Sequence, residues 1–167
     1  MKEAKVTLTK KDLLYDVDAL TYKRVDATLA GEAQRAQNAL SSDSSEDLDG
    51  SILNRLISTR LAKIKRKLAF AIKANNQSMV ASPTTTLSES IEIPLMVPDN
   101  YTQDQLSSLS DMMHDYLVKG TIRDWYKNAG VVSTVDDSEL EELESAIVCS
   151  LRVGYTRRPM QPFGPRK

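Results

Sequence analysis

Residues 52–74 constrain the fold of this chain more than any other stretch. Lysines and arginines fill most of one side of a helix drawn through them, and no acidic residue interrupts the run. The pattern predicts a helix over about 52–74 with one buried and one basic face. The buried face consists of apolar residues at steps of three and four, namely Leu53, Leu56, Ile57, Leu61, Ile64, Leu68, Ala71 and Ile72.

An earlier stretch shows the same helical period more loosely. Apolar residues at mostly three- and four-residue steps predict a helix over about 10–40. Gly31 weakens the middle of this helix by about 1 kcal/mol relative to alanine. Residues 41–51, SSDSSEDLDGS, are rich in serine and aspartate and predict a solvated loop. We therefore expect a helix–loop–helix hairpin over about 10–74.

Two more helices are expected in the second half of the chain. A T-x-x-Q capping box at 102–105 predicts a helix over about 102–128. An S-x-x-E box at 138–141 predicts another over about 136–153. The apolar stripe of each helix provides a face for packing, so the four predicted helices favour a bundle.

Between the second and third helices the apolar period changes to two. The odd positions of 87–97 are nearly all apolar, which predicts a β-strand, and we expect an extended β-arm over about 79–97. Pro94 cannot donate to a ladder, so the strand lies at a sheet edge or ends there. Its pairing partner stays open between residues 5–9, the 79–86 stretch folded back, and a strand of a neighbouring subunit.

The charges of the chain cancel in blocks. Lys and Arg total 22, Asp and Glu total 23, and the formal net charge is −1. A global attraction for nucleic acid or an anionic membrane is therefore excluded as a default. The blocks are basic at 60–73, acidic at 136–144 and basic again at 152–167. Such blocks favour copies of the chain, or closely fitted neighbours, that pair with one another.

These patterns together predict a mainly α fold. We expect one helical domain over 1–153, a bundle of about four helices with an extended β-arm or edge strand. Residues 154–167 contain three prolines and no acid, and we expect them to form an extended C-terminal arm. No window is long and apolar enough for a membrane helix and the first residues do not resemble a secretory signal, so we expect a soluble, cytosol-made protein.

The sequence offers few groups for catalysis. His114 and Cys149 are the only residues of their kinds, and we interpret them as a surface or boundary imidazole and a core thiol rather than a nucleophilic dyad. We expect no enzyme, no cofactor and no metal site. The acidic cluster over 136–144 suits a helix start favoured by the dipole better than a cation site. Its members are Asp136, Asp137, Glu139, Glu141, Glu142 and Glu144.

Residues 91–130 carry a family resemblance. Their sequence, IEIPLMVPDNYTQDQLSSLSDMMHDYLVKGTIRDWYKNAG, resembles small tailed-phage proteins encoded near the portal, in which an IELPLxxP-type segment leads into a helix ending in DWY or DWL. The opening LTKKDLLYDVDALTYKRVDA and the terminal RRPMQPFG are also similar. The resemblance covers about two-thirds of the chain. It implies a head–tail connector protein, adaptor or neck-ring, and points to the crAss-like phage group.

The resemblance implies a structural protein of the virion that forms a ring, commonly twelvefold, beneath the portal at the head–tail junction. Its partners are then further copies, the portal, and other connector or tail proteins. We expect two sets of residues to contact neighbouring subunits, the β-arm residues Ile91, Ile93 and Leu95 and the tail residues Arg157, Arg158 and Phe163. If the ring encircles DNA, the candidates for facing it are Arg60, Lys63, Arg66 and Lys67.

A second hypothesis assigns the same basic helix to another class of protein. The run at 60–73 also suits a cytoplasmic nucleic-acid-binding or regulatory helical protein. This run and the long loop at 41–51 depart from the family pattern and leave the ring position open. The two hypotheses differ in behaviour, because a connector assembles through its tail whereas a regulator binds duplex with a strong salt dependence.

Overall fold

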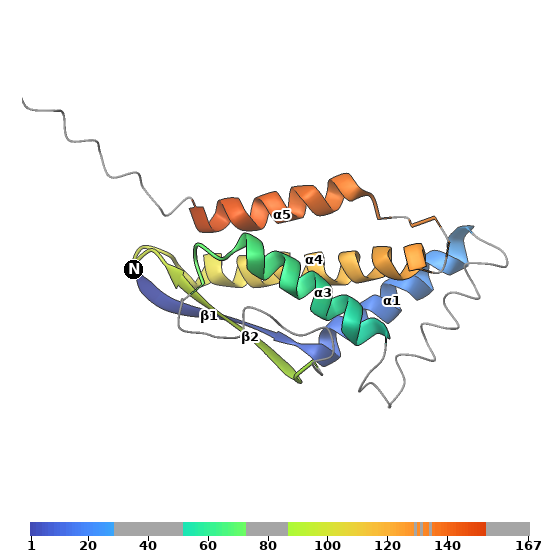
Figure 1. The fold of residues 1–167 in the computed structure, drawn as a ribbon, viewed down its shortest axis with the longest axis horizontal. Coiled ribbons are helices and arrows are strands. Elements are labelled where there is room, and N and C mark those ends of the chain that lie inside the picture. Colours follow the sequence, from blue (N-terminus) through green and yellow to red (C-terminus); the bar gives the residue numbers. More distant parts are fainter. Residues whose placement is uncertain (29–51, 73–86, 129, 131, 134, 153–167) are drawn as a thin grey trace, which may run out of the picture.

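The computed structural model describes residues 1–28, 52–72, 87–128, 130, 132, 133 and 135–152, with residues 22–28 described in backbone only. This part of the chain contains four helices and a two-stranded sheet, which confirms the predicted mainly α fold (Figure 1). In chain order the elements are β1 (Lys2–Thr9), α1 (Lys10–Thr28), α3 (Ile52–Lys67), β2 (Ser90–Val97), α4 (Gln103–Asn128) and α5 (Asp137–Arg152).

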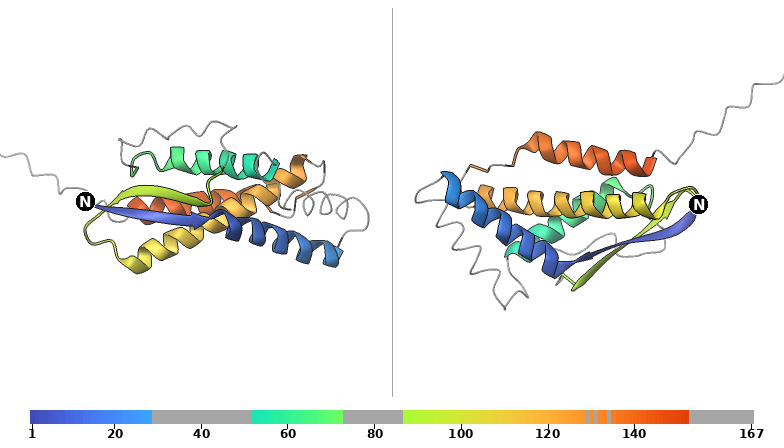
Figure 2. Two further views of the ribbon diagram at one scale, coloured as in Figure 1. Left: turned by 90° about the horizontal axis from the view of Figure 1, so that it is seen from below. Right: turned by 180° about the vertical axis from the view of Figure 1, so that it is seen from behind.

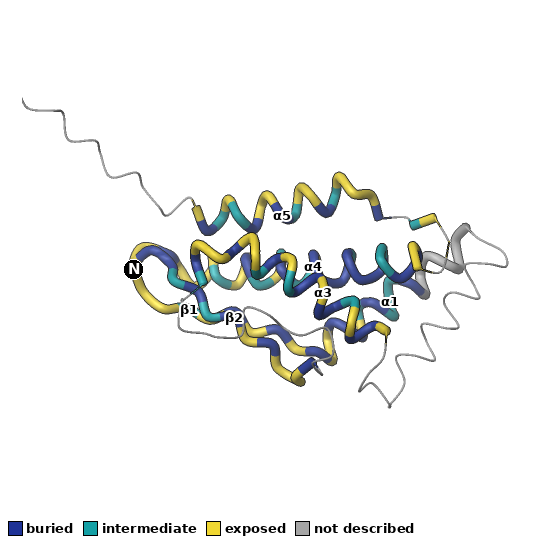
Figure 3. Tube along the Cα trace, viewed as in Figure 1, coloured by how far each residue is buried: buried dark blue, intermediate teal, exposed yellow. Residues whose placement is uncertain are grey.

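Helix α4 is the centre of the arrangement. It contacts α1, α3, α5 and β1. In two opposite views α5 lies on one side of α4, and α1 and α3 lie toward the other (Figures 1 and 2). The inward faces of these elements are buried, whereas the outward face of α5 is exposed (Figure 3). The residues of α4 with no exposed surface are mainly apolar: Leu109, Met113, Tyr116, Leu117, Thr121 and Ile122.

The ends of α4 follow the signals in the sequence. The Thr102 backbone N–H donates to Gln105 Oε1 at 2.8 Å, and the Gln105 N–H donates to Thr102 Oγ1 at 3.2 Å. These two bonds confirm the predicted capping box. At the other end, Gly130 adopts a φ of 71°, a left-handed conformation that glycine reaches without strain.

The sheet pairs two strands of the same chain. β1 and β2 are antiparallel, with Val6 opposite Ile93 and Leu8 opposite Ile91. Of the three partners left open by the sequence, the structure therefore shows the N-terminal one, extended back to Lys2. The face of the sheet toward the helices is buried, and β2 contributes Ile91, Ile93, Leu95 and Val97 to it.

Pro94 occupies a position where its missing N–H costs nothing. The Met96 N–H donates to the Ala71 carbonyl at 2.6 Å, on the side of β2 away from β1. Backbone groups two residues apart point to the same side of a strand, so the Pro94 nitrogen also faces that outer edge. The predicted edge position of Pro94 is confirmed.

The second predicted helix is shorter than expected. Helix α3 ends at Lys67 instead of about residue 74. The chain then turns, and Ile72 pairs with Leu95 on the outer edge of β2. Leu68 and Ala71 stay buried as the sequence predicted. Pairing with the strand edge ends the helix, although the apolar period continues past that point.

The remaining predictions have mixed outcomes. Helix α5 begins at Asp137, and the Asp136 carbonyl accepts from the Leu140 N–H at 3.4 Å, so Asp136 holds the capping position. Ser138 therefore lies inside the first turn, and the predicted S-x-x-E box is wrong. The helix predicted over 10–40 is described as far as Thr28. Residues 29–51, 79–86 and 154–167, with the predictions made for them, lie outside the described residues.

Candidate functional site

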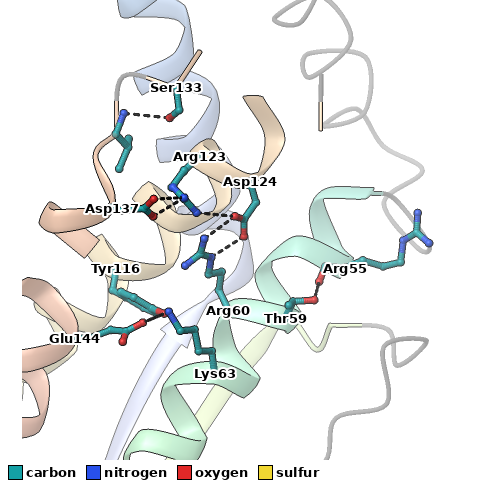
Figure 4. Close-up of polar contacts among 11 residues, drawn as sticks. Arg55, Thr59, Arg60, Lys63, Tyr116, Arg123, Asp124, Ser133, Asp137 and Glu144 are labelled. Atoms are coloured by element: carbon teal, nitrogen blue, oxygen red, sulfur yellow. Dashed lines mark hydrogen bonds and ion pairs between the residues drawn. The ribbon is translucent and has the colours of Figure 1, made fainter. Parts of the chain in front are cut away.

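A network of charged side chains lies where α3 and α5 meet α4 (Figure 4). Each of the three helices contributes a residue that is largely buried: Arg60 from α3 is 6% exposed, Glu144 from α5 is 7% exposed, and Tyr116 from α4 has no exposed surface. Charged residues are rarely buried to this degree unless they are paired. The residues that pair with Arg60 and Glu144 therefore link the three helices to one another.

Arg60 forms a bidentate ion pair with Asp124 of α4. Its Nε donates to Asp124 Oδ2 at 2.6 Å, and its Nη2 donates to Oδ1 at 2.5 Å. Burial lowers the pKa of Arg60, but hydrogen bonds to Asp124 and Tyr116 outweigh burial and leave the pKa raised. The guanidinium is therefore fully charged, and its charge is neutralised by a partner held in fork geometry.

Gly120 makes room for the Arg60 side chain. A Cβ atom built at residue 120 would lie 2.9 Å from Arg60 Cδ and 3.0 Å from Nε. Real Cβ atoms essentially never approach another heavy atom as closely as 2.9 Å, so the arginine would have to shift. A glycine in the middle of a helix costs about 1 kcal/mol relative to alanine. Here it lets the arginine cross α4 and reach Asp124.

Glu144 accepts hydrogen bonds from both of the other helices. Tyr116 donates its hydroxyl to Oε1 at 2.7 Å, and Lys63 Nζ lies 2.5 Å from the same oxygen. Lys67 Nζ lies 3.7 Å from Oε2. Burial raises the pKa of Glu144, but the hydrogen bonds from Lys63 and Tyr116 outweigh it, so the pKa is lowered.

The Tyr116 hydroxyl stays protonated for the complementary reason. Burial first, and then its bond to the Glu144 carboxylate, raise the pKa of Tyr116 well above its usual 10. Across the neutral range Glu144 is ionised and Tyr116 is neutral, so neither group is poised to exchange a proton. The arrangement can hold α3 and α5 against α4, and it offers no general acid or base near pH 7.

Two further ion pairs fasten the first turns of α5 to α4. Arg123 Nη2 donates to Asp137 Oδ2 at 2.5 Å, and Lys119 Nζ donates to Glu139 Oε1 at 2.8 Å. Together with the Tyr116–Glu144 bond, these pairs show that α4 and α5 run antiparallel. Residues 116, 119 and 123 of α4 contact residues 144, 139 and 137 of α5. The interpretation of residues 136–144 as a solvated helix start holds for Asp137 and Glu139, whose side chains stay substantially exposed in the first turn of α5, and is wrong for Glu144, which is buried. In the part of the chain that the structure describes, no cluster of three or more His, Cys, Asp or Glu side chains is arranged to hold a metal.

The predicted basic face of α3 is divided in two. Arg60 is buried against Asp124 and does not face outward, so its assignment as a DNA-facing residue is wrong. The sequence contained the signal, because residue 60 lies three positions after Ile57 and four before Ile64, on the buried stripe. Lys63, Arg66 and Lys67 are exposed, and two of them, Lys63 and Lys67, contact Glu144.

The three β-arm residues predicted to contact a neighbouring subunit lie in the core of their own chain, so that prediction is wrong for them. Ile91, Ile93 and Leu95 are at most 4% exposed and belong to the core of their own chain. Their side chains already pack against the helices of the same subunit, so they leave little apolar surface for a neighbour. Arg157, Arg158 and Phe163 lie outside the described residues.

The lone histidine and cysteine serve no common site. His114 Nε2 lies 2.8 Å from Asp16 Oδ2, which joins α4 to α1, as expected of a boundary imidazole. Cys149 is exposed, so the prediction of a core thiol is wrong. It lies two residues after the buried Ile147 and therefore falls off the buried stripe of α5.

Cys149 lines an open groove between α3 and α5. The groove has a volume of about 580 Å³. Beyond the last turn of α3, the Arg152 guanidinium lies 5.3 Å from the centre of the Phe70 ring. The lining is mixed in polarity and in charge, with Lys63 and Lys67 from α3 and Glu141, Glu144, Ser145, Val148, Cys149 and Arg152 from α5.

Two further findings concern the chain as a possible membrane protein and its similarity to known proteins. Among the helices of the described residues, none combines the length and the apolar character that crossing a membrane requires. Comparison with protein-family models, with curated proteins and with solved structures finds no match to this chain.

Proposed function

We propose that this chain is a structural virion protein of a tailed phage, a subunit of the ring that joins the portal to the tail. The support begins with the sequence resemblance over residues 91–130. In the structure that stretch forms most of β2 and all of α4. Because α1, α3, α5 and β1 all contact α4, the resemblance falls on the part of the chain that organises the rest.

The network on α4 is the single observation that carries the proposal. Its most buried charged residues, Arg60 and Glu144, are engaged in bonds between helices. Arg123 and Lys119 bind the start of α5 in the same way. Charges used in this manner hold a fixed shape, which is what a building block of a particle requires.

The basic surface that could face DNA in the proposed ring is smaller than the sequence predicted. Lys63, Arg66 and Lys67 remain exposed along the second half of α3. Contact with packaged DNA through these side chains would be independent of sequence and would weaken as salt is raised. Glu144 neutralises part of this charge, so we expect the passage contact to be weak.

Co-production with the portal protein of the same genome tests the proposal. We expect native mass spectrometry to show a complex with many copies of this chain, and negative-stain images to show a closed ring. Deletion of residues 155–167 should abolish the complex while the circular dichroism of the helices is unchanged. Arg66→Gln, which changes the proposed DNA-facing surface but leaves the tail intact, should still form the complex with the portal.

The opposite result would favour the alternative function. A chain that forms no complex with the portal, stays monomeric and binds duplex DNA with a steep salt dependence would be a nucleic-acid-binding protein. Loss of that binding in Lys63→Glu plus Lys67→Glu would assign it to the basic helix. The connector proposal would then be refuted.

A further inference from the structure

The groove between α3 and α5 separates its charges along its length. Glu141 lies near one end of it, and Arg152 lies near the other, eleven residues along α5 or about 16 Å at the helical rise. Lys67 Nζ of α3 lies 3.7 Å from Glu144 Oε2, so its charge sits between the two ends of the groove. Helices α3 and α5 run in the same direction (Figure 1). Between the two ends lie Ser145, Val148 and Cys149, together with Glu144, whose carboxylate contacts Lys63 and Lys67.

The charged residues at the two ends of the groove form the fewest contacts within their own subunit. Glu144 and Lys63 are bound to one another, at 2.5 Å. Lys67 lies 3.7 Å from Glu144 and half of its side chain is exposed. Glu141 is exposed and forms no ion pair within the described residues, and Arg152 is exposed above the Phe70 ring.

We infer that this groove is a two-fold interface with a second copy of the same chain. In the dimer the two α5 helices lie antiparallel, with Glu141 of each copy against Arg152 of the other. An interface of this kind requires a surface that is complementary to itself. An acidic end at Glu141 and a basic end at Arg152 satisfy that requirement, because a two-fold rotation brings each end of one copy against the opposite end of the other.

The same lining argues against nucleic acid as the occupant. Its three cations, Lys63, Lys67 and Arg152, face two carboxylates, those of Glu141 and Glu144. A phosphate backbone would meet the exposed Glu141 carboxylate, and like charges repel. A second copy of the chain supplies a cation for that carboxylate and an acid for the cations. The dimer goes beyond the proposed connector function, since the contacts within a cyclic ring join two different surfaces. With the groove covered by the second copy, Arg66, which lies outside the groove lining, is the cation of the proposed DNA-facing set that stays available to DNA.

Charge reversal in the full-length chain tests the pairing. By sedimentation or native mass, we expect the wild-type chain alone to be a dimer that weakens with salt. Glu141→Lys and Arg152→Glu should each weaken the dimer about tenfold or more, because each reversal places like charges together. The double variant Glu141→Lys plus Arg152→Glu should recover most of the affinity. Glu142→Lys, one residue along α5 but outside the groove lining, is the matched control and should have little effect.

A cross-link tests the two-fold geometry independently. Ser145→Cys in a Cys149→Ser background places a thiol near the proposed axis. Under oxidation by copper phenanthroline we expect a disulfide-linked dimer, and Tyr15→Cys in the same background, exposed on α1, should not cross-link. Circular dichroism and melting temperature show whether each variant is folded.

Several results would overturn the interface. A wild-type monomer or a cyclic ring in the absence of portal, a double reversal that does not recover, or a Ser145→Cys variant that does not cross-link would each do so. If the reversals change duplex DNA binding of a monomer, the groove is a nucleic-acid site instead. None of these results depends on whether the chain binds the portal, so the two proposals fail separately.

Discussion

Removing the Asp124 carboxylate should be the most damaging change to the network on α4. Asp124→Ala leaves the Arg60 guanidinium buried without the partner that binds it through both Nε and Nη2. Breaking a buried ion pair by removing one partner costs about 3–5 kcal/mol. The Asp124 side chain is 21% exposed, so water can reach part of the site. We therefore expect a loss near the lower end, about 3 kcal/mol.

The opposite truncation should cost less. Arg60→Met leaves Asp124 partly exposed and 3.6 Å from Arg123 Nη1, so its carboxylate keeps both water and a cation. We expect a loss of about 1–2 kcal/mol. Replacing both residues, Arg60→Met plus Asp124→Leu, should bring stability back to within about 1 kcal/mol of the wild type, because a buried ion pair contributes little over well-packed apolar side chains.

Urea unfolding followed by circular dichroism measures all three changes. The midpoint and slope of each transition give the free energy of unfolding, and an unchanged slope shows that the folded state is comparable. The reasoning predicts that Asp124→Ala is the worst of the three variants. The reasoning would be refuted if Asp124→Ala lowered the free energy of unfolding by less than Arg60→Met. It would also be refuted if the double variant lost as much stability as Asp124→Ala and Arg60→Met lose together.

Two further predictions address neighbouring groups of the same network. Gly120→Ala should destabilise the wild type by about 1–2 kcal/mol, because its Cβ would contact Arg60. In an Arg60→Ala background the same substitution should stabilise the protein by about 1 kcal/mol through helix propensity. Urea unfolding of the wild type, the two single variants and the double variant measures both effects, and equal effects in the two backgrounds would contradict the close contact. Tyr116→Phe should lower stability at neutral pH by about 1 kcal/mol, because Glu144 loses a donor. The raised pKa of Tyr116 gives stability that is complete below pH 10 and is lost as pH rises toward the folded-state pKa, so the free energy of unfolding should fall less steeply above pH 10 in Tyr116→Phe. An unchanged alkaline slope would show that the hydroxyl is not held by Glu144.

The elements that local rules determine could be predicted from the sequence. The capping box at Thr102 and Gln105 and the period-two pattern of β2 depend on neighbouring residues, and both are present. The end of α3 could not be predicted, because Ala71 and Ile72 leave the helix to contact β2, more than twenty residues away in the sequence. The helical period of a sequence does not show that backbone groups near the end of a helix will instead pair with the edge of a strand.

The charge network could be predicted only in part. The basic and acidic blocks are plain in the sequence, but periodicity does not show whether they pair within one chain or between copies. Arg60 and Glu144 each lie on the buried stripe of their helix, and that position was the available signal. Gly120 gives no such signal, since its role depends on a side chain from another helix. Cys149 lies next to the buried stripe of α5, and its position beside that stripe does not show that it is exposed in a groove.

The titration of Glu144 tests the central claim most directly, namely that charges of opposite sign are paired within one subunit. Burial by itself would raise the pKa of this carboxyl above its usual 4.5, and only the bonds from Lys63 and Tyr116 lower it. A lowered pKa means that the stability it contributes is present above pH 4.5 and is lost as pH falls through the folded-state value. By carbon-detected NMR of the side-chain carboxyl, we expect a midpoint below 4.5 that rises in Lys63→Gln. A midpoint at or above 4.5 in the wild type, unchanged by Lys63→Gln, would contradict the account.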